Sequence, residues 1–453
     1  MKLLSPAIAT LAVLPITALA ASKATTPNVI YILVDDLGYG DLSCYGQTML
    51  TTPCIDALAQ GGMRFTQFYA GCTVSAPSRC SLMTGKHTGH THVRGNRSVK
   101  GTDGLVYDTP IPAKEFTLGE LFKSKGYATA AVGKWGLGGI GSAGHPNKQG
   151  FDYYYGCLGQ AHAHRYFPTH LHENSTLVQL DQKEYSHDLI EGKAVDFIKK
   201  NKDNPFFLYF ALTLPHAELN LPKEYTTQFE GKFKEPEPFA GKNNYCPQAE
   251  PYKVFASMVT RMDASVGTIM SLLEELGIAK NTMVVFSSDN GPHAEGGANP
   301  EYFKSSGIYR GIKRDLWEGG IRVPMIVNYP GVVKKGQESD YMGGFWDFMA
   351  TFGELIGADV PAESDGISIM PTLMGKKQKE QHEYLYWEFH ERNGRQAIRM
   401  GDWKLIRQNW KKADNTYYEL FNIAADPSEK NNLAKSDPER VEQMKAIMDS
   451  AHK

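Results

Sequence analysis

The sequence has little net charge and no long apolar run beyond its first twenty residues. Its 48 lysines and arginines nearly balance its 50 aspartates and glutamates, which leaves a formal net charge of −2. Because nucleic-acid-binding domains usually carry a basic excess, nucleic acid is not expected as a partner. No later stretch reaches the roughly 18 continuous apolar residues that a membrane helix needs, so no transmembrane segment is expected.

Cysteine is also scarce, with six in 453 residues, and no pair has the spacing of a zinc site. The even count permits full pairing into disulfides in an oxidising compartment. Cys44 and Cys54 would close a short loop, whereas Cys72 and Cys80 flank Ser75. The sequence leaves the connectivity open.

The N-terminus has the pattern of a secretory signal peptide over residues 1–20. Lys2 supplies a positive charge, residues 3–19 are largely apolar, and Ala18-Leu19-Ala20 matches a small-x-small cleavage site. We therefore expect an exported protein, periplasmic or extracellular, whose mature chain starts near Ala21. The alternative interpretation is a buried N-terminal helix.

Short apolar runs alternate with helix-like segments between about residues 28 and 335. Such β-branched or aromatic runs, bounded by polar turns, fit parallel strands covered on both faces. The runs cover residues 28–34, 127–132, 205–214, 282–287 and 323–328, with helices expected at 118–124 and 254–276. The pattern predicts an α/β domain over residues 27–375, with a large, mostly parallel central sheet flanked by helices.

The character of the sequence changes after about residue 380. Four short strand-like runs within residues 384–421 are typical of an antiparallel meander, and a charged helix is expected over 438–452. These segments predict a small C-terminal α+β subdomain with an antiparallel sheet over residues 380–453.

Polar residues follow four of the predicted strands, and in open parallel sheets ligands bind beyond the carboxyl ends of the strands. They are Asp35-Asp36, Lys134, His216 and Asp289-Asn290. The aspartates and the asparagine offer only oxygen ligands, which suit calcium or magnesium. Calcium is favoured because it accepts more ligands and flexible carboxylates. Strand-end turns are the alternative interpretation of Asp-Asp and Asp-Asn-Gly.

One eleven-residue stretch carries the most specific chemistry. From Ser75 to Gly85 it reads Ser-Ala-Pro-Ser-Arg-Cys-Ser-Leu-Met-Thr-Gly, and it resembles the maturation signature of the type I sulfatases. In that family a Cys or Ser followed by x-Pro-Ser-Arg is oxidised to formylglycine, whose hydrate attacks sulfur with one hydroxyl and expels sulfate with the other. The resemblance implies a maturation enzyme acting on Ser75 by the radical-type bacterial route. A turn or helix N-cap is the alternative.

The resemblance extends over nearly the whole mature chain, to a secreted bacterial type I sulfatase with the alkaline phosphatase superfamily fold. The matching segments are residues 34–41, 133–135, 288–292, 318–324, 400–404 and 426–427. The resemblance implies one calcium ion, with ligands at Asp35, Asp36, Asp289, Asn290 and the formylglycine from Ser75. It also implies that Arg79 steadies the formylglycine and that Lys134, His216 and Lys313 grip the sulfate, since fixed cations meet its charge.

One position departs from the family pattern. The family often reads Gly-Lys-Trp-His-Leu-Gly, whereas this chain has Gly136 where that pattern has its histidine. In the family that histidine contacts the formylglycine and assists the second step. His90 and His92 are the nearest histidines in sequence that could substitute.

A polar and aromatic run, Gln160 to Tyr166 (QAHAHRY), suits recognition of sugar hydroxyls. It resembles a segment that borders the substrate pocket of bacterial carbohydrate sulfatases, and a solvated loop is the alternative. The candidate substrate-binding residues are His162, His164 and Arg165, with Trp387 and His390 as a possible sugar-stacking wall.

These features predict an enzyme that hydrolyses sulfate esters on a glycan, with a galactose or N-acetylgalactosamine type unit favoured. One alternative is a phosphatase or phosphonate monoester hydrolase of the same superfamily; those with two zinc ions need histidine and aspartate ligands beyond the predicted metal positions. Another is a non-catalytic protein that binds sulfated glycans, which would follow if Ser75 stays unmodified. The sugar and the sulfate position depend on loops and stay open, as does the oligomeric state.

Overall fold

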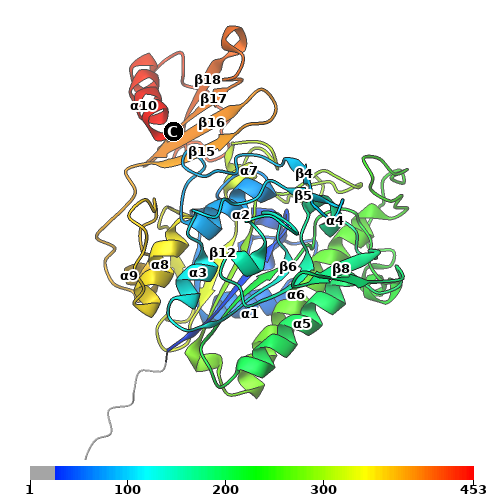
Figure 1. The fold of residues 1–453 in the computed structure, drawn as a ribbon. Coiled ribbons are helices and arrows are strands. Elements are labelled where there is room, and N and C mark those ends of the chain that lie inside the picture. Colours follow the sequence, from blue (N-terminus) through cyan, green and yellow to red (C-terminus); the bar gives the residue numbers. More distant parts are fainter. Residues whose placement is uncertain (1–25) are drawn as a thin grey trace, which may run out of the picture.

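In the computed structural model, which describes residues 26–453, the chain folds around a ten-stranded mixed sheet (Figure 1). The predicted signal peptide lies outside the described residues. The strand order is β13-β2-β12-β11-β1-β10-β6-β7-β8-β9. The strands are β1 (Asn28–Val34), β2 (Met63–Phe65), β6 (Ala128–Lys134), β7 (Tyr153–Cys157), β8 (His170–Glu173), β9 (Thr176–Gln179), β10 (Phe206–Ala211), β11 (Thr282–Ser288), β12 (Met325–Asn328) and β13 (Gln337–Ser339).

The five central strands β11, β1, β10, β6 and β7 run parallel, which confirms the predicted α/β fold with a mostly parallel sheet. Their carboxyl ends therefore meet at one edge, here called the carboxyl edge. β12 is antiparallel to β11, so the parallel reading of residues 323–328 was wrong. A parallel strand needs a crossover to the opposite edge, whereas the chain enters β12 from the edge at which β11 ends.

Helices cover both faces of the sheet (Figure 1). Alternate side chains of β1 point to opposite faces, so Ile30, Ile32 and Val34 join one core cluster while neighbouring residues join another. One face is covered by α1 (Pro53–Gly61), α5 (Ser186–Asn201) and α6 (Pro251–Glu275). The other is covered by α2 (Ser75–Thr84), α3 (Leu118–Lys123), α8 (Asp347–Ile356) and α9 (Met370–Leu373).

Smaller elements lie around this body. They are the pair β3 (Phe68–Tyr69) and β14 (Gly343–Gly344), the hairpin β4 (Ser98–Lys100) and β5 (Val106–Asp108), and the short helices α4 (Gln160–Ala163) and α7 (Glu318–Ile321). No helix among residues 26–453 is long and apolar enough to span a membrane. All six cysteines are free thiols, so the structure contains none of the disulfides that the even count permits.

The C-terminal region forms a four-stranded antiparallel sheet, as predicted, coloured orange to red in Figure 1. Its elements are β15 (Leu385–Phe389), β16 (Arg395–Met400), β17 (Trp403–Gln408), β18 (Tyr417–Asn422) and α10 (Pro438–Ala451). α10 covers one face, and the opposite face packs on the main body around Tyr69 and Trp346.

This packing rules out the sugar-stacking role predicted for Trp387. Its side chain is 0 % exposed and packs against Tyr69 and Trp346. Its indole N–H donates a hydrogen bond to the Ala70 carbonyl at 2.9 Å. Trp387 is therefore part of the core that joins the C-terminal sheet to the main body.

Candidate active site

Three carboxylates meet at the carboxyl edge of the main sheet. Asp35 and Asp36 directly follow β1, and Asp289 directly follows the neighbouring strand β11. Each offers an oxygen within 4.8 Å of the others, and all three residues are 0 % exposed. Burying three adjacent carboxylates is costly unless cations compensate them.

Ser75 lies beside this group as the first residue of α2 and is 1 % exposed. Its hydroxyl donates to Asp35 Oδ1 at 3.0 Å, and it accepts from Lys134 Nζ at 3.2 Å. The residue before the helix is Val74, and its side chain makes no cap. The Ser75 hydroxyl thus faces a carboxylate and an ammonium group, which does not fit the alternative of a plain N-cap.

Arg79 lies one helical turn after Ser75 and ties α2 to the strand ends. Its Nε and Nη2 donate to Asp289 Oδ2 at 3.0 and 2.8 Å, and its Nη1 donates to the Lys134 carbonyl at 3.1 Å. Burial would lower the pKa of this guanidinium, but the neighbouring Tyr209 and Asp289 outweigh it and raise the pKa. Arg79 therefore stays charged and fixes the direction of α2.

Two buried lysines complete the charge balance. Lys134, the last residue of β6, places its Nζ 2.5 Å from Asp35 Oδ2. Lys313 Nζ lies 2.7 Å from Asp36 Oδ2 and 3.2 Å from Glu295 Oε2. Burial would lower the pKa of Lys313, but the two carboxylates outweigh it and raise the pKa. Lys313 is thus held charged beside Asp36, and Lys134 Nζ lies 3.2 Å from the Ser75 hydroxyl.

His216 follows β10 and meets the same group from the loop above the sheet. Its Nε2 accepts from Lys313 Nζ at 2.8 Å, which leaves Nδ1–H to donate to the Ala217 carbonyl. Burial lowers its pKa well below the ordinary value, and His164 and Lys313 lower it further. His216 is therefore a neutral ring that orients the Lys313 ammonium.

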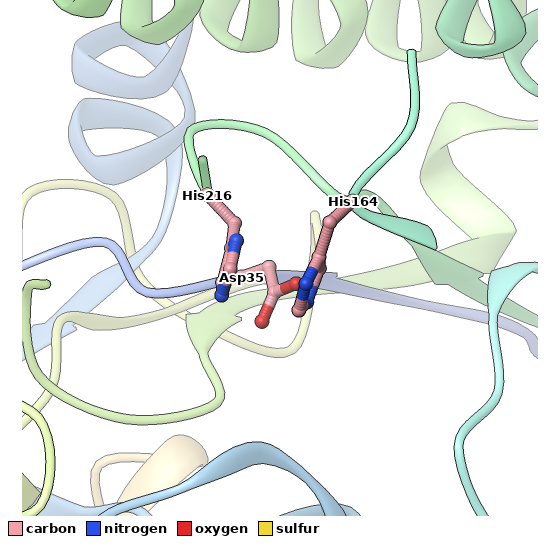
Figure 2. Close-up of side chains that lie close together, drawn as sticks. All are labelled: Asp35, His164 and His216. Carbon is pink, nitrogen blue, oxygen red and sulfur yellow. The ribbon is translucent and has the colours of Figure 1, made fainter. Parts of the chain in front are cut away.

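His164 lies at the centre of the site, not at its rim. Its ring stacks on His216 with centroids 3.8 Å apart and an interplanar angle of 14°. Figure 2 shows the two rings beside the Asp35 carboxylate, and each of the three residues has a ligand atom within 4.8 Å of the others. Burial lowers the pKa of His164, and Lys134 and Lys313 lower it further.

The donor set fits a calcium ion. The buried Asn290 Oδ1 has no hydrogen-bond partner among residues 26–453, while its Nδ2 donates to Asp36 Oδ1 at 2.7 Å. Burial raises the pKa of Asp289, and the adjacent Asp35 carboxylate raises it further, a strain that a cation would relieve. Three carboxylates and an unpartnered amide oxygen are the hard ligands that calcium prefers.

Histidines also lie next to the aspartates: His216 was predicted at this edge, His164 was predicted as a substrate-binding residue, and His293 was not predicted. Asp35 groups with His164 and His216, and Asp36 groups with His293 and Glu295. The Lys313 ammonium group covers His216 Nε2. His293 Nδ1 accepts from the Glu295 N–H at 3.1 Å, and its Nε2 donates to the Pro215 carbonyl at 3.2 Å. The His216 and His293 rings offer no free lone pair, whereas His164 Nε2 is buried without a partner among residues 26–453. This single free nitrogen falls short of the ligands that two zinc ions require.

The other predicted substrate residues contact partners outside the carboxylate group. The His162 ring packs at a tilt against His170 with centroids 4.1 Å apart, and Arg165 pairs with Glu218 at 2.6 Å. His390 bonds to Glu388 at 2.7 Å and packs against Trp410 in the C-terminal region. They remain candidates for contact with a larger substrate.

Neither histidine proposed to replace the missing one lies beside Ser75. His90 Nδ1 bonds to Asp365 Oδ1 at 2.8 Å, and the Asp365 N–H donates to the Gly85 carbonyl. This places His90 at the far end of α2, about 15 Å from Ser75 at 1.5 Å per residue. His92 is exposed.

Sequence reasoning missed several residues of the site. His293 and Glu295 follow the end of β11 by a few residues, so the strand-end rule that found Asp289 could have found them. Gln160 begins the polar run that was predicted to contact sugar, but it was not singled out. Asp108 had no signal, because its contact with the Gln160 N–H depends on how β5 packs beside α4.

Comparisons with known proteins agree with this geometry. The family model "Sulfatase" matches residues 27–358, and the model "N-sulphoglucosamine sulphohydrolase, C-terminal" matches residues 308–452. The chain is 31 % identical to an N-acetylgalactosamine-6-O-sulfatase of Bacteroides thetaiotaomicron, over 94 % of this chain and 93 % of that protein. It is 32 % identical to the human N-acetylgalactosamine-6-sulfatase, over 78 % of this chain and 67 % of that protein.

Solved structures show the same fold. The structure of Ps i-CgsB in complex with k-i-k-neocarrahexaose is 30 % identical, with a TM-score of 0.79 over 94 % of both chains. A phosphonate monoester hydrolase of Agrobacterium radiobacter matches with a TM-score of 0.68 at 18 % identity, which shows the fold alone. The family model covers most of the chain, so the chain belongs to the sulfatase family of sulfuric ester hydrolases.

Proposed function

We propose that this protein removes sulfate from a glycan through a formylglycine derived from Ser75. The observation that carries the proposal is the place of the Ser75 hydroxyl, buried between the Asp35 carboxylate and the Lys134 ammonium group. A formylglycine hydrate at this position would supply a nucleophilic hydroxyl and a second hydroxyl for release of sulfate. A maturation enzyme that accepts serine would have to act before α2 becomes buried.

A calcium ion fits the same site. Asp35, Asp36, Asp289 and Asn290 would hold it together with the residue formed from Ser75, and bound calcium would supply positive charge near the sulfate. Arg79, Lys134 and Lys313 balance the three aspartates in number. An added divalent cation would make the site net positive, which favours binding of a sulfate monoester.

The residues around Ser75 have distinct tasks in this proposal. Lys134 and Lys313 meet the negative charge that develops on the sulfate oxygens, in a site closed to water. His216 orients Lys313 through its Nε2, and the protonated Lys313 is the group placed to stabilise or protonate the leaving oxygen. Arg79 holds the helix turn that carries the nucleophile.

The favoured substrate is a sulfated galactose or N-acetylgalactosamine unit. Relatives named as N-acetylgalactosamine-6-sulfatases and a structure holding a neocarrahexaose support this class. We also propose that the protein is exported, because residues 1–20 have the pattern of a signal peptide. The sugar and the sulfate position would be set by loops around α4 and the C-terminal sheet.

The test is to measure kcat/KM on an aryl sulfate, an aryl phosphate and a panel of monosulfated galactose, N-acetylgalactosamine and N-acetylglucosamine. We expect the aryl sulfate to be preferred over the phosphate and one galactose-type sugar to be preferred over N-acetylglucosamine. A preference for phosphate would support the phosphatase alternative. Glycan binding without turnover, on protein with unmodified Ser75, would support the non-catalytic alternative.

A further inference from the structure

Gly136 lies two residues after Lys134 in a backbone conformation with φ +75°. A Cβ added there would lie 2.2 Å from Gln160 Nε2 and 2.8 Å from Gln160 Cδ. The Gln160 carboxamide therefore occupies the space that a side chain at position 136 would need. Gly136 and Gln160 are brought together because the chain after β7 runs beside the chain after β6, with Gly136 N–H donating to the Leu158 carbonyl at 3.0 Å.

The Gln160 side chain is buried and unpartnered. The residue is 6 % exposed, and neither Nε2 nor Oε1 has a hydrogen-bond partner among residues 26–453. Leaving a buried carboxamide unpaired costs free energy, so the Gln160 amide has donors and an acceptor available for a ligand. Its backbone is fixed, because the Gln160 N–H donates to Asp108 Oδ2 at 2.7 Å.

The helix turn that carries Gln160 faces the catalytic centre. Gln160 and His164 are four residues apart at the two ends of α4, so they lie on one face of the turn. His164 stacks on His216 and approaches the Asp35 carboxylate (Figure 2). His164 Nε2 is also buried without a partner in the described part of the chain. The face of α4 that carries Gln160 and His164 thus presents unpartnered polar groups, and His164 places this face beside the Asp35 carboxylate.

We propose that the Gln160 carboxamide binds the sulfate group of the substrate, in the space that the glycine at position 136 leaves free. This inference rests on the proposed sulfatase function. The amide N–H groups would donate to a sulfate oxygen beside the Lys134 ammonium group. A carboxamide neither gains nor loses a proton in the working range of pH, so it contributes by binding and orientation.

The first experiment compares Gln160→Ala with the parent on an aryl sulfate and on the best sulfated sugar. A hydrogen bond to a charged group predicts a loss of about 10- to 100-fold in kcat/KM, equal on both substrates, because both share the sulfate group. The control is Gln396→Ala. Gln396 is likewise buried with an unpartnered Oε1, but it lies in β16 of the C-terminal sheet. We expect this control to keep kcat/KM.

The second experiment places a carboxamide at position 136 instead of position 160. Asparagine tolerates positive φ better than most residues, so Gly136→Asn is acceptable once Gln160 is truncated. In the parent, Gly136→Asn should lower activity because its Cβ meets Gln160. In the Gln160→Ala background, Gly136→Asn should raise kcat/KM several-fold. The difference between the effects in the two backgrounds is the coupling that a double-mutant cycle measures.

Three outcomes would overturn the inference. They are a loss confined to the sugar substrate, a lower Tm with unchanged kcat/KM, or an equal effect of Gly136→Asn in both backgrounds. Formylglycine content by mass and the Tm with calcium are measured on every variant. A parent without sulfatase activity would refute the proposed function, whereas an active parent with an equally active Gln160→Ala would refute only this inference.

Discussion

Two regions of the molecule bury lysines among carboxylates, and they differ in what is left unpaired. At the junction with the C-terminal sheet, Lys404 Nζ lies 2.9 Å from Glu318 Oε1 and 3.0 Å from Glu429 Oε1, with all three side chains 0 % exposed. At the carboxyl edge, Lys134 and Lys313 contact Asp35 and Asp36 in the same manner. Charge and burial alone do not separate the two clusters.

The difference lies in hydrogen-bonding capacity. Both carboxylate oxygens of Glu318 are occupied, one by Lys404 and the other by the Tyr69 hydroxyl at 2.7 Å. At the carboxyl edge, Asn290 Oδ1, His164 Nε2 and the Gln160 carboxamide have no partner among the described residues. Glu429 Oε1 at the junction also lacks a hydrogen bond, but it lies 3.0 Å from the Lys404 ammonium group. The three unpartnered groups at the carboxyl edge are instead neutral donors and acceptors, which a bound ligand could satisfy.

The largest effect is expected from Ser75→Ala. The variant should keep its Tm within a few degrees, because the core does not depend on this hydroxyl, and lose kcat on an aryl sulfate by at least about 10⁴-fold. Circular dichroism and steady-state kinetics measure the two quantities. Substantial turnover by pure Ser75→Ala protein would refute the formylglycine mechanism.

Removal of the metal should nearly abolish activity and also lower the Tm. A ligand bound only by the folded state stabilises that state, so chelation should remove both effects and calcium should restore them better than zinc does. The oxygen donor set at Asp35, Asp36, Asp289 and Asn290 is the reason. Full activity in a metal-free preparation would show that these residues do not form a required metal site.

Three lysine variants test the comparison directly. Lys313→Ala should lower kcat/KM by about 10²-fold on an aryl sulfate and on a sulfated sugar alike, because the sulfate group is common to both. Lys134→Ala should behave in the same way. Lys404→Ala should instead lower the free energy of unfolding by about 3–5 kcal/mol, since it leaves buried carboxylates unpaired.

The control is the kcat of Lys404→Ala, which should not change. Lys404→Ala that still folds at low temperature should keep most of its kcat. Loss of kcat without loss of stability in Lys404→Ala would mean that the junction takes part in catalysis and that the distinction drawn here is wrong.

Acid should weaken the C-terminal region through Glu388. Burial raises the pKa of this carboxyl, but bonds from His390 and Arg94 outweigh it and lower the pKa to about 2, against 4.5 for the free side chain. A lowered folded-state pKa stabilises the protein above pH 4.5, and this stabilisation, about 3 kcal/mol, is lost as the pH falls toward 2. Urea unfolding at several pH values should show the difference between parent and Glu388→Gln shrinking over that window; a constant difference would contradict it.

The smallest effect is expected from His162→Ala. His162 packs against His170, outside the carboxylate group, so its loss should reduce kcat/KM on the best sulfated sugar by about 10-fold and spare the aryl sulfate. His164→Ala should impair both substrates, because its ring lies on His216. Equal cleavage of the sugar by His162→Ala and the parent would refute a substrate role for His162.

Much of the fold and the charged centre could be predicted from local sequence. β1 and β11 are continuous buried runs followed directly by aspartates, so the pattern predicted both the strands and the carboxylates at their ends. β7 was missed because its aromatic run is only three residues long before Gly156 and Cys157, shorter than the runs that marked the other central strands. Trp387 was misassigned because both faces of its sheet are covered, one by α10 and one by the main body.

The features that the sequence did not predict depend on contacts between segments far apart in the chain. His164 reaches the centre by stacking on a residue 52 positions away in the chain, which no local pattern specifies. The Gln160 carboxamide fills the space that a side chain at position 136 would need. This contact depends on the positive φ of Gly136 and on the pairing of β6 with β7. Only the arrangement in space brings these residues together.

The central claim is that Ser75 becomes the nucleophile as formylglycine, and peptide mass tests it most directly. Protein produced with a maturation enzyme that accepts serine is digested, and the mass of the Ser75 peptide is compared with the activity of the same preparation. The account predicts a peptide lighter by about 2 Da, from loss of two hydrogens, in proportion to kcat across preparations. Full activity in a preparation whose Ser75 peptide has the mass of unmodified serine would contradict it.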